Sequence, residues 1–366
     1  MTSTAATLVE PVHGKFHVIT GANGTGKTRY LSSLSSKILS ELDRGAGEYS
    51  RMLCLSGTVY DKFPRVKIEE RVNDRYIYLG NKTNNNMFSE ISPFRNLSTH
   101  LLSDRTDNQE RSGLAQRILE TIGFEKTLKL KFRRARNTVD ATLAPAGLEL
   151  QISLGDNYRI GDIESLRREQ IEDSKIHLSG ITVIKDGAPY ELEELSSGER
   201  LYLLVVLGIC FCTENNSLIL FDEPENSLHP KWQTKLIQDI NFVVREISHN
   251  STIVIATHSP LIVSSAPNID SFIRNLPAQD DWLDFEFFGR NSDAILESQF
   301  GLLSPRSLTV MSSVQNCLSA LTMVQSDPQI FLDAVSVLDG LEINFEAEDP
   351  LYTTVKEIFA IRRTMQ

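Results

Sequence analysis

The sequence has few cysteines and no long apolar segment. Its four cysteines, Cys54, Cys210, Cys212 and Cys317, show neither the spacing of zinc ligands nor that of a disulfide framework, so we expect buried free thiols in a reducing compartment. No run of about 18 apolar residues occurs, and we therefore expect no membrane-spanning helix. The first dozen residues lack the basic start and apolar stretch of a secretory signal, which favours a cytoplasmic protein.

The sequence also has fewer basic than acidic residues. The chain has 37 Lys and Arg against 48 Asp and Glu, a formal net charge of −11. This balance argues against adhesion of the whole surface to nucleic acid but leaves room for a local basic groove. A hydrophobic content of 41% is ordinary for a globular protein, and a length of 366 residues suggests two or three domains.

A glycine-rich segment follows the first expected strand. Residues 15–20 alternate and then become apolar, as in a buried strand, and residues 21–28 fit the pattern G-x-x-x-x-G-K-T. Apolar residues at helical spacing follow. Glycines leave backbone N–H groups open to a phosphate chain, and the next helix directs its positive end at the same anion. We expect ATP phosphates to be bound by Asn23, Gly24, Thr25, Gly26, Lys27 and Thr28.

An acidic pair follows a second apolar run. Residues 218–221 predict a buried strand, and Asp222 stands at its carboxyl end, where open α/β sheets bind ligands. We expect Asp222 and the Thr28 hydroxyl to hold Mg²⁺. Glu223 would then polarise the water that attacks ATP. A solvated acidic turn is the alternative.

Buried strands and helices alternate in this part of the chain. Helices are expected at residues 201–212 and from Pro230, and a further buried strand at residues 251–257. Such alternation implies a parallel sheet that is covered on both faces. Asp186 and Gly187 predict the turn of a hairpin.

Two further motifs narrow the class. Residues 195–200, Leu-Ser-Ser-Gly-Glu-Arg, resemble the signature of ABC ATPases, in which this loop contacts the γ-phosphate held by a partner subunit. The resemblance implies a homodimer bridged by ATP, with Ser197 and Gly198 at the nucleotide. Residues 256–260 resemble the switch-histidine segment, so His258 would contact the γ-phosphate and help to place the lytic water. A plain helix cap and a structural histidine are the alternatives, but all four motifs occur in the family's order.

The sequence of residues 222–230, Asp-Glu-Pro-Glu-Asn-Ser-Leu-His-Pro, departs from the pattern of ABC transporters. It resembles the SMC-related ATPases and, more narrowly, the OLD-type ATPases and those of the Septu, retron and PARIS anti-phage systems. The resemblance covers residues 16–45 and 181–275. It implies an α/β ABC-type P-loop ATPase with a mainly parallel sheet, an N-terminal antiparallel β region and a helical insertion.

We expect three parts. Residues 1–190 would form the lobe with the P-loop and an insertion at about 60–180, residues 191–275 the lobe with the other motifs, and residues 276–366 a helical extension. OLD nucleases carry a TOPRIM domain with an Asp-x-Asp cluster, and no such cluster follows Pro267, so we expect no intrinsic nuclease activity. Gln109 and Gln116 are candidates for the family's glutamine loop.

One basic run contains no acid. Its cations are Lys126, Lys129, Lys131, Arg133, Arg134 and Arg136. If it forms a strand, alternation places Lys129, Lys131 and Arg133 on one face. The run either contacts a nucleic-acid backbone or is a solvated edge strand whose lysines discourage aggregation.

The leading hypothesis is therefore an ATPase that senses or regulates a separate effector, a nuclease or toxin, in anti-phage defence. A DNA-repair clamp of the RecF type is the second hypothesis. A third hypothesis, the ATPase subunit of a transporter, is weakened by the Leu-His-Pro ending of the acidic motif and by the missing membrane segments.

Overall fold

The computed structural model describes residues 8–65, 75–84, 87–103, 105–134, 148–155, 158–160, 176–290, 295–296, 298–299, 308–322, 327–343, 349 and 351–365. These residues form two compact units, within residues 1–301 and 302–366, and each is described by itself. No helix in the described ranges is long and apolar enough to cross a membrane.

A seven-stranded sheet organises the first unit, in the order β14-β13-β1-β12-β11-β2-β3. Six strands are parallel, and β14 pairs antiparallel to β13. The strands are β1 (Phe16–Thr20), β2 (Arg51–Ser56), β3 (Tyr76–Leu79), β11 (Ser217–Asp222), β12 (Thr252–Ala256), β13 (Ser271–Asn275) and β14 (Leu283–Asp284). This mixed α/β architecture with a mainly parallel sheet confirms the expected fold class.

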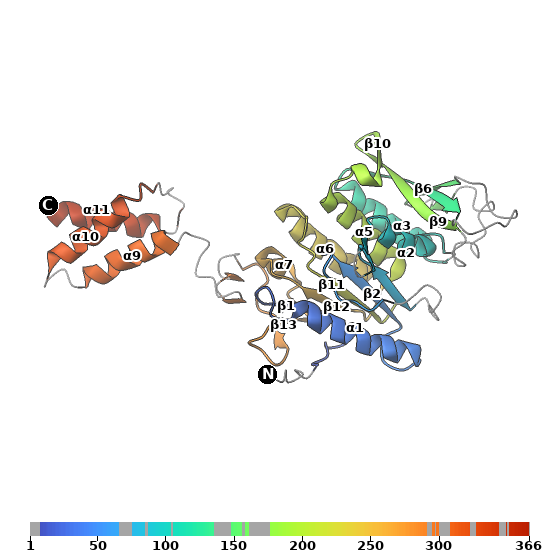
Figure 1. The fold of residues 1–366 in the computed structure, drawn as a ribbon, viewed down its shortest axis with the longest axis horizontal. Coiled ribbons are helices and arrows are strands. Elements are labelled where there is room, and N and C mark those ends of the chain that lie inside the picture. Colours follow the sequence, from blue (N-terminus) through green and yellow to red (C-terminus); the bar gives the residue numbers. More distant parts are fainter. Residues whose placement is uncertain are drawn as a thin grey trace. The chain divides into compact units, whose positions relative to one another are not determined.

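Helices cover both faces of this sheet (Figure 1). One face packs against α1 (Lys27–Asp43), and the other against α5 (Ser197–Cys212) and α6 (Pro230–Ile247). Because side chains alternate along a strand, Met52 belongs to the α1 core and Leu53 to the larger core on the α5 side. Both faces are buried, which is why the strands are continuous apolar runs.

A second sheet is antiparallel, in the order β10-β9-β6-β7-β8. Its strands are β6 (Phe124–Arg134), β7 (Glu149–Ser153), β8 (Arg159–Ile160), β9 (Ile176–Lys185) and β10 (Ala188–Glu191). The apolar face of this sheet joins the core that contains α2 (Ser92–Leu101) and α3 (Asn108–Glu120). The expected antiparallel region thus comes from residues 124–191, and α2 and α3 precede it in the chain.

Smaller elements complete the first unit. They are the hairpin of β4 (Lys82–Asn84) and β5 (Met87–Phe88), the 3₁₀ turn η3 (Leu192–Glu194) and α7 (Pro260–Ser265). The expected hairpin turn is present, with φ of 50° at Asp186 and 81° at Gly187 between β9 and β10.

Three expectations need correction or lie outside the described residues. The basic strand β6 is not an edge strand, because β9 and β7 pair with it on either side. The chain does not divide at residue 190, since β11 to β13 share one sheet with β1 to β3, and the first unit extends past residue 276 to 301. Part of the helical insertion expected at about residues 60–180 lies outside the described ranges, including residues 161–175.

The second unit is a small helical bundle. It consists of α9 (Leu308–Leu321), α10 (Pro328–Asp339) and α11 (Tyr352–Met365). Asp327 caps α10 by accepting a hydrogen bond from the Gln329 backbone N–H at 3.0 Å. The three helices share a core of their own, which includes Val314, Phe331 and Ile358.

Candidate nucleotide-binding site

Strand order brings the sequence motifs together. β12 lies between β1 and β11, and all three strands are parallel. The loops that follow them therefore emerge at one edge of the sheet. The loop after β1 is the P-loop, that after β11 carries Asp222 and Glu223, and that after β12 carries His258.

The P-loop connects β1 directly to α1. Gly26 precedes the helix with φ of 111°, a conformation that residues with a Cβ rarely adopt. The Lys27 side chain is buried, and its Nζ donates to the carbonyl oxygens of Gly21 at 2.8 Å and Ala22 at 3.2 Å. Burial lowers the pKa of Lys27, and nearby carboxylates, chiefly that of Glu223, oppose this shift. Phosphate oxygens could replace the two carbonyl contacts.

Thr28 and Asp222 form the expected pair for a metal ion. The Thr28 hydroxyl donates to Asp222 Oδ1 at 3.3 Å. Asp222 is fully buried, and its Oδ2 has no hydrogen-bond partner among the described residues. Burial raises the pKa of Asp222 to about 7. A hydroxyl and a buried carboxylate with one free oxygen fit Mg²⁺, which prefers oxygen ligands.

Glu223 follows β11 in a strained conformation. Its φ is 50°, and its backbone N–H donates to the Ala256 carbonyl at 2.8 Å, which ties the turn to β12. Its side chain is partly exposed, and Oε2 accepts a hydrogen bond from Asn226 Nδ2 at 2.8 Å. A carboxylate held at the mouth of the site can polarise a water molecule.

His258 lies beside two carboxylates. Its Nδ1 is 3.1 Å from Glu225 Oε1 and 3.8 Å from Glu223 Oε1. The ring is 42% exposed, whereas the Glu225 side chain is only 5% exposed. Glu225 and Asn226 were given no role from the sequence, although a second carboxylate so soon after a buried strand was a visible signal.

The signature loop stands apart from the P-loop of its own chain. The N-cap of α5 is Ser196, which forms a capping box with Glu199. Ser197 is exposed in the first turn of the helix. Gly198 lies against the loop after Glu223, since a Cβ on it would be 2.6 Å from the Ser227 carbonyl oxygen. No described interaction joins Ser197 or Gly198 to Lys27.

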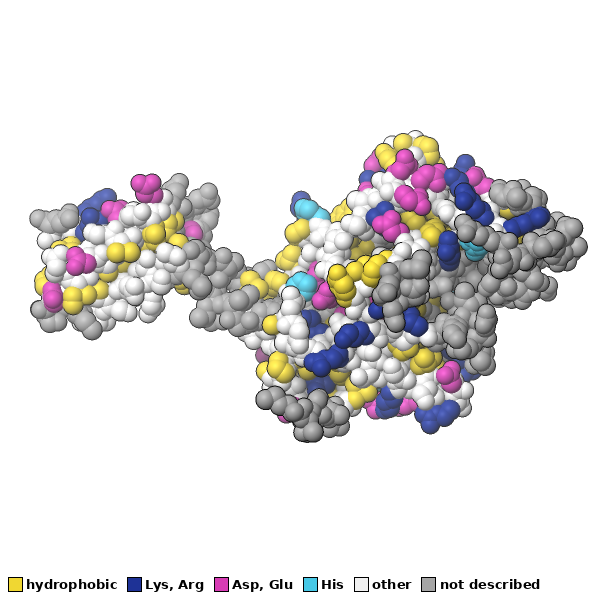
Figure 2. All heavy atoms as spheres, in the orientation of Figure 1, with side chains coloured by type: hydrophobic (Ala, Val, Ile, Leu, Met, Phe, Trp, Pro, Cys, Tyr) yellow, Lys and Arg dark blue, Asp and Glu magenta, His cyan; other side chains and the backbone are white. Residues whose placement is uncertain are grey.

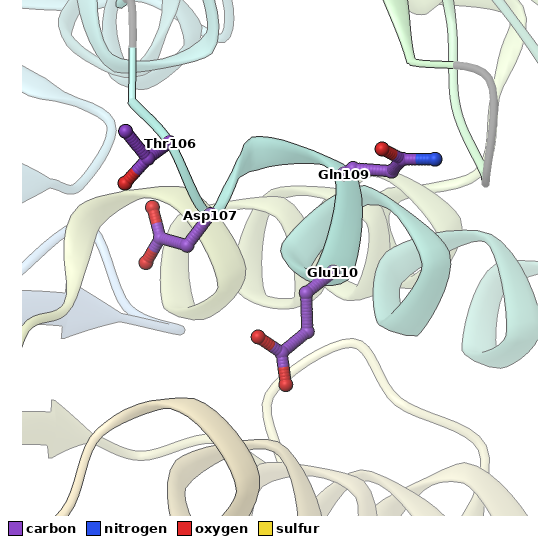
Figure 3. A pocket seen from close by; sticks show the side chains of 4 residues that line it. All are labelled: Thr106, Asp107, Gln109 and Glu110. Carbon is purple, nitrogen blue, oxygen red and sulfur yellow. The ribbon is translucent and has the colours of Figure 1, made fainter.

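The two candidate glutamines lie elsewhere. Gln109 stands at the start of α3, beside a shallow pocket that is also lined by Thr106, Asp107 and Glu110 (Figure 3). The next turn of α3 is fixed to the far end of α5, because Arg111 donates to the carbonyl of Cys210. Gln116 donates to Glu120 on the same helix. The contacts described for the two glutamines are with residues at the start of α3 and along it, and they support neither assignment.

The positive charge of the basic strand β6 is partly neutralised by nearby glutamates. The alternation predicted for β6 is confirmed, with Leu128, Leu130 and Phe132 buried. On the opposite face, Lys129 lies 3.6 Å from Glu149 and Lys131 lies 2.6 Å from Glu191. Figure 2 shows basic and acidic side chains close together in this part of the surface. Arg136 lies outside the described residues.

A phosphate-binding loop, a threonine–aspartate pair and a glutamate–histidine pair meet at one sheet edge, and a helix-capping Leu-Ser-Ser-Gly loop packs against the segment that follows Glu223. This combination defines a P-loop ATPase of the ABC/SMC type. The family described as "AAA domain, putative AbiEii toxin, Type IV TA system" matches residues 60–264, more than half of the chain, and the chain belongs to that family. The matched segment contains Asp222, Glu223 and His258 but begins after the P-loop.

Individual relatives agree with the resemblance indicated by the motifs. The chain is 25% identical over 356 residues to protein ea59 of Escherichia phage lambda, covering 90% of this chain and 62% of ea59. It is 26% identical over 333 residues to Septu protein PtuA of Bacillus thuringiensis, covering 80% of each. It is 29% identical over 148 residues to "Retron Vc95 probable ATPase" of Vibrio cholerae serotype O1 biovar El Tor, covering 35% of this chain and 27% of the relative. The chain thus spans less than two thirds of the length of ea59.

The matches to solved structures are more distant. The SMC head bound to the C-winged helix domain of ScpA matches 72% of this chain and 87% of its own, at 12% identity and a TM-score of 0.32. The cbiO1 protein of Clostridium perfringens, part of an ABC transporter complex, matches 75% and 80%, at 11% identity and a TM-score of 0.30. Likeness at this level supports no conclusion about function.

Proposed function

We propose that this chain binds Mg²⁺–ATP at the carboxyl edge of its parallel sheet and hydrolyses it there. The observation that carries the proposal is the contact of Thr28 with Asp222, together with the buried and unpartnered Oδ2 of Asp222. A buried carboxylate oxygen without a donor is costly unless a cation or proton occupies it. The adjoining P-loop supplies the phosphate site that such a cation would share.

Each side chain has a separate task in this proposal. Lys27 exchanges its carbonyl contacts for oxygens of the β- and γ-phosphates, and Thr28 and Asp222 hold the metal. The metal, when bound, neutralises charge on the phosphates. Glu223 orients and polarises the attacking water, and His258 presents its exposed ring to the γ-phosphate. The backbone groups of Asn23, Gly24, Thr25 and Gly26 complete the phosphate loop.

The Lys27→Ala variant tests this assignment. It removes a charge-assisted contact to the terminal phosphates, so ATP binding should be lost in calorimetric titration. Lys37→Ala is a matched control on the same helix, because Lys37 is partly exposed and pairs with Glu10 and Glu41 rather than with the P-loop. Equal ATP affinity in both variants would contradict the assignment of the P-loop.

We further propose that two copies of the chain close around ATP. The exposed Ser197 and the neighbouring Gly198 have no described contact with the P-loop of the same chain. A second copy related by a twofold axis could place its own signature loop against each bound nucleotide. ATP binding and hydrolysis would then close and open the dimer, a two-state element that can hold or release a partner.

The partner that we propose is a separate effector protein, a nuclease or toxin, in anti-phage defence. The relatives that carry the Septu and retron names support this role. We expect no nuclease activity from the chain itself, because Asp222 and Glu223 are assigned to ATP and the described residues contain no other cluster suited to a metal. A partner that co-purifies and is released on ATP hydrolysis is the expected result. Cleavage of DNA or RNA by the purified chain would contradict it.

DNA repair of the RecF type is the competing function. It requires a cationic surface for the phosphate backbone. The pairing of Lys129 and Lys131 with glutamates weakens that candidate surface. ATP hydrolysis that is stimulated several-fold by plain DNA would favour the competing function over the sensor.

A further inference from the structure

Glu225 is a buried carboxylate that the proposed mechanism does not yet use. Its Oε1 accepts hydrogen bonds from Thr257 Oγ1 and from the His258 backbone N–H, both at 2.7 Å. The same oxygen lies 3.1 Å from His258 Nδ1. Its Oε2 is buried without a hydrogen-bond partner among the described residues. A single carboxylate therefore binds the backbone of His258 and lies beside its ring.

This contact favours one form of the ring. The carboxylate is an acceptor with negative charge, so it favours a hydrogen on the nearer ring nitrogen, Nδ1. The other ring nitrogen, Nε2, is then the one left for a ligand, and the carboxylates of Glu223 and Glu225 both lie on the Nδ1 side of the ring. Carboxylates orient functional histidines in this way elsewhere, by fixing the tautomer and the ring direction.

We propose that Glu225 is a positioning residue for ATP hydrolysis and acts through His258. It holds an N–H at Nδ1 and aims Nε2 at the terminal phosphate. The inference rests on the proposed function, since it assumes that ATP is hydrolysed at this site. Glu225 itself touches neither the phosphates nor the lytic water.

A purely structural role for Glu225 makes a different prediction. Its bonds to Thr257 and to the His258 backbone tie the loop after β12 to the turn after β11. Glu225→Gln keeps a carbonyl oxygen that can accept both of these bonds but removes the negative charge beside the ring. If tethering were the whole role, this substitution would leave turnover unchanged.

The test is a double-mutant cycle in the full-length protein. Steady-state hydrolysis and ATP affinity are measured for the wild type, Glu225→Gln, His258→Ala and the double variant. We expect His258→Ala to lower kcat by about 10²–10³-fold, as for loss of one donor to a transition state. Glu225→Gln alone should lower kcat by about 10–100-fold with ATP affinity unchanged. In the His258→Ala background, Glu225→Gln should change kcat by less than about twofold, because the effects of substitutions at residues that act as a unit are not additive.

Glu214→Gln is the matched control. Glu214 is likewise a carboxylate with fixed partners, at 2.8 Å from Arg51 and 3.1 Å from Arg105, but it lies at the opposite edge of the sheet. Its turnover should equal that of the wild type. Unchanged ATP affinity in Glu225→Gln shows that the variant has folded with an intact P-loop.

Two results would overturn the inference. One is wild-type turnover in Glu225→Gln or in His258→Ala. The other is an equal loss from Glu225→Gln in both backgrounds, which would mean that Glu225 does not act through His258. Neither result affects the ATP-binding assignment, which fails only if Lys27→Ala still binds ATP.

Discussion

Asp222 shows how a single residue couples stability to function. Its folded-state pKa of about 7 exceeds the ordinary value of 3.8 because the carboxyl is buried. The metal-free folded protein thus holds a proton between about pH 4 and 7 that the unfolded chain has released. The free energy of unfolding therefore falls as the pH rises through that window and stays low above it. A bound cation would relieve this cost.

Asp222→Asn should therefore stabilise the metal-free protein at pH 8 but not at pH 4, where the carboxyl is protonated in the folded state. Thermal unfolding in EDTA measures this stabilisation, because each kcal/mol of added unfolding free energy raises Tm by about 2–4 °C. The variant should also lose the stabilisation that Mg²⁺–ATP gives to the wild type. Equal Tm changes at pH 4 and pH 8 would show that burial of the charge is not the cause.

Residue identities in the motifs could be predicted because each chemical task requires particular side chains. The hydrogen-bond partners of those residues could not be predicted. Glu225 holds the Thr257 hydroxyl across 32 residues of sequence, a contact that only the pairing of β11 with β12 creates. The capping box of Ser196 with Glu199 was not predicted either, because helix ends cannot be placed to one residue from propensities.

At the level of elements, apolar segments next to a motif were predicted, and one without a motif was missed. The strands β1, β11 and β12 and the helix α5 follow from mainly apolar sequence beside the motifs. The strand β2 was missed because its four apolar residues stand between Arg51 and Ser56 and lead into no motif, whereas the equally short run of β11 leads into the acidic pair. That arginine is buried by pairing with Glu214 and with the Cys212 carbonyl, a tertiary arrangement that the local sequence does not show.

The strand β1 carries a buried histidine that predicts acid sensitivity. His17 is fully buried, and Nε2 accepts a hydrogen bond from the Val12 backbone N–H at 2.9 Å. Burial lowers its pKa from 6.5 to about 4. The unfolded chain therefore takes up a proton between pH 6.5 and 4 that the folded chain does not, and stability is lost as the pH falls through this window.

His17→Gln keeps an acceptor but cannot be protonated in this range. Between pH 7 and pH 5 the wild type should lose about 2 kcal/mol of unfolding free energy more than the variant does, as linkage requires for such a pKa change. Urea titrations at the two pH values measure the difference. Parallel losses in both proteins would place the acid sensitivity in other groups.

For the whole molecule, the question is whether one nucleotide is shared by two chains. A substitution in the signature must act on the partner without damaging its own chain. Gly198 is unsuitable, because any Cβ would collide with the Ser227 carbonyl. Ser197→Asp is better: Ser197 is exposed at a helix N-terminus, where a carboxylate is locally favourable but would repel an opposing γ-phosphate.

Mixing Ser197→Asp with Lys27→Ala should restore part of the hydrolysis that each variant lacks alone. A heterodimer of the two retains one site in which an intact P-loop faces an intact signature loop. Turnover measured against the mixing ratio should peak near equal amounts. If heterodimers form, as shown by pull-down of differently tagged chains, and turnover stays absent, the sites are not shared.

The most direct test of the central claim is ATP turnover by Glu223→Gln. Glutamine keeps the acceptor for Asn226 Nδ2 but cannot polarise water as a carboxylate does. The variant should bind Mg²⁺–ATP as tightly as the wild type, hydrolyse it about 10²–10⁴-fold more slowly, and accumulate as an ATP-dependent dimer. Wild-type turnover in Glu223→Gln would show that another group activates the water and that the site does not work as proposed.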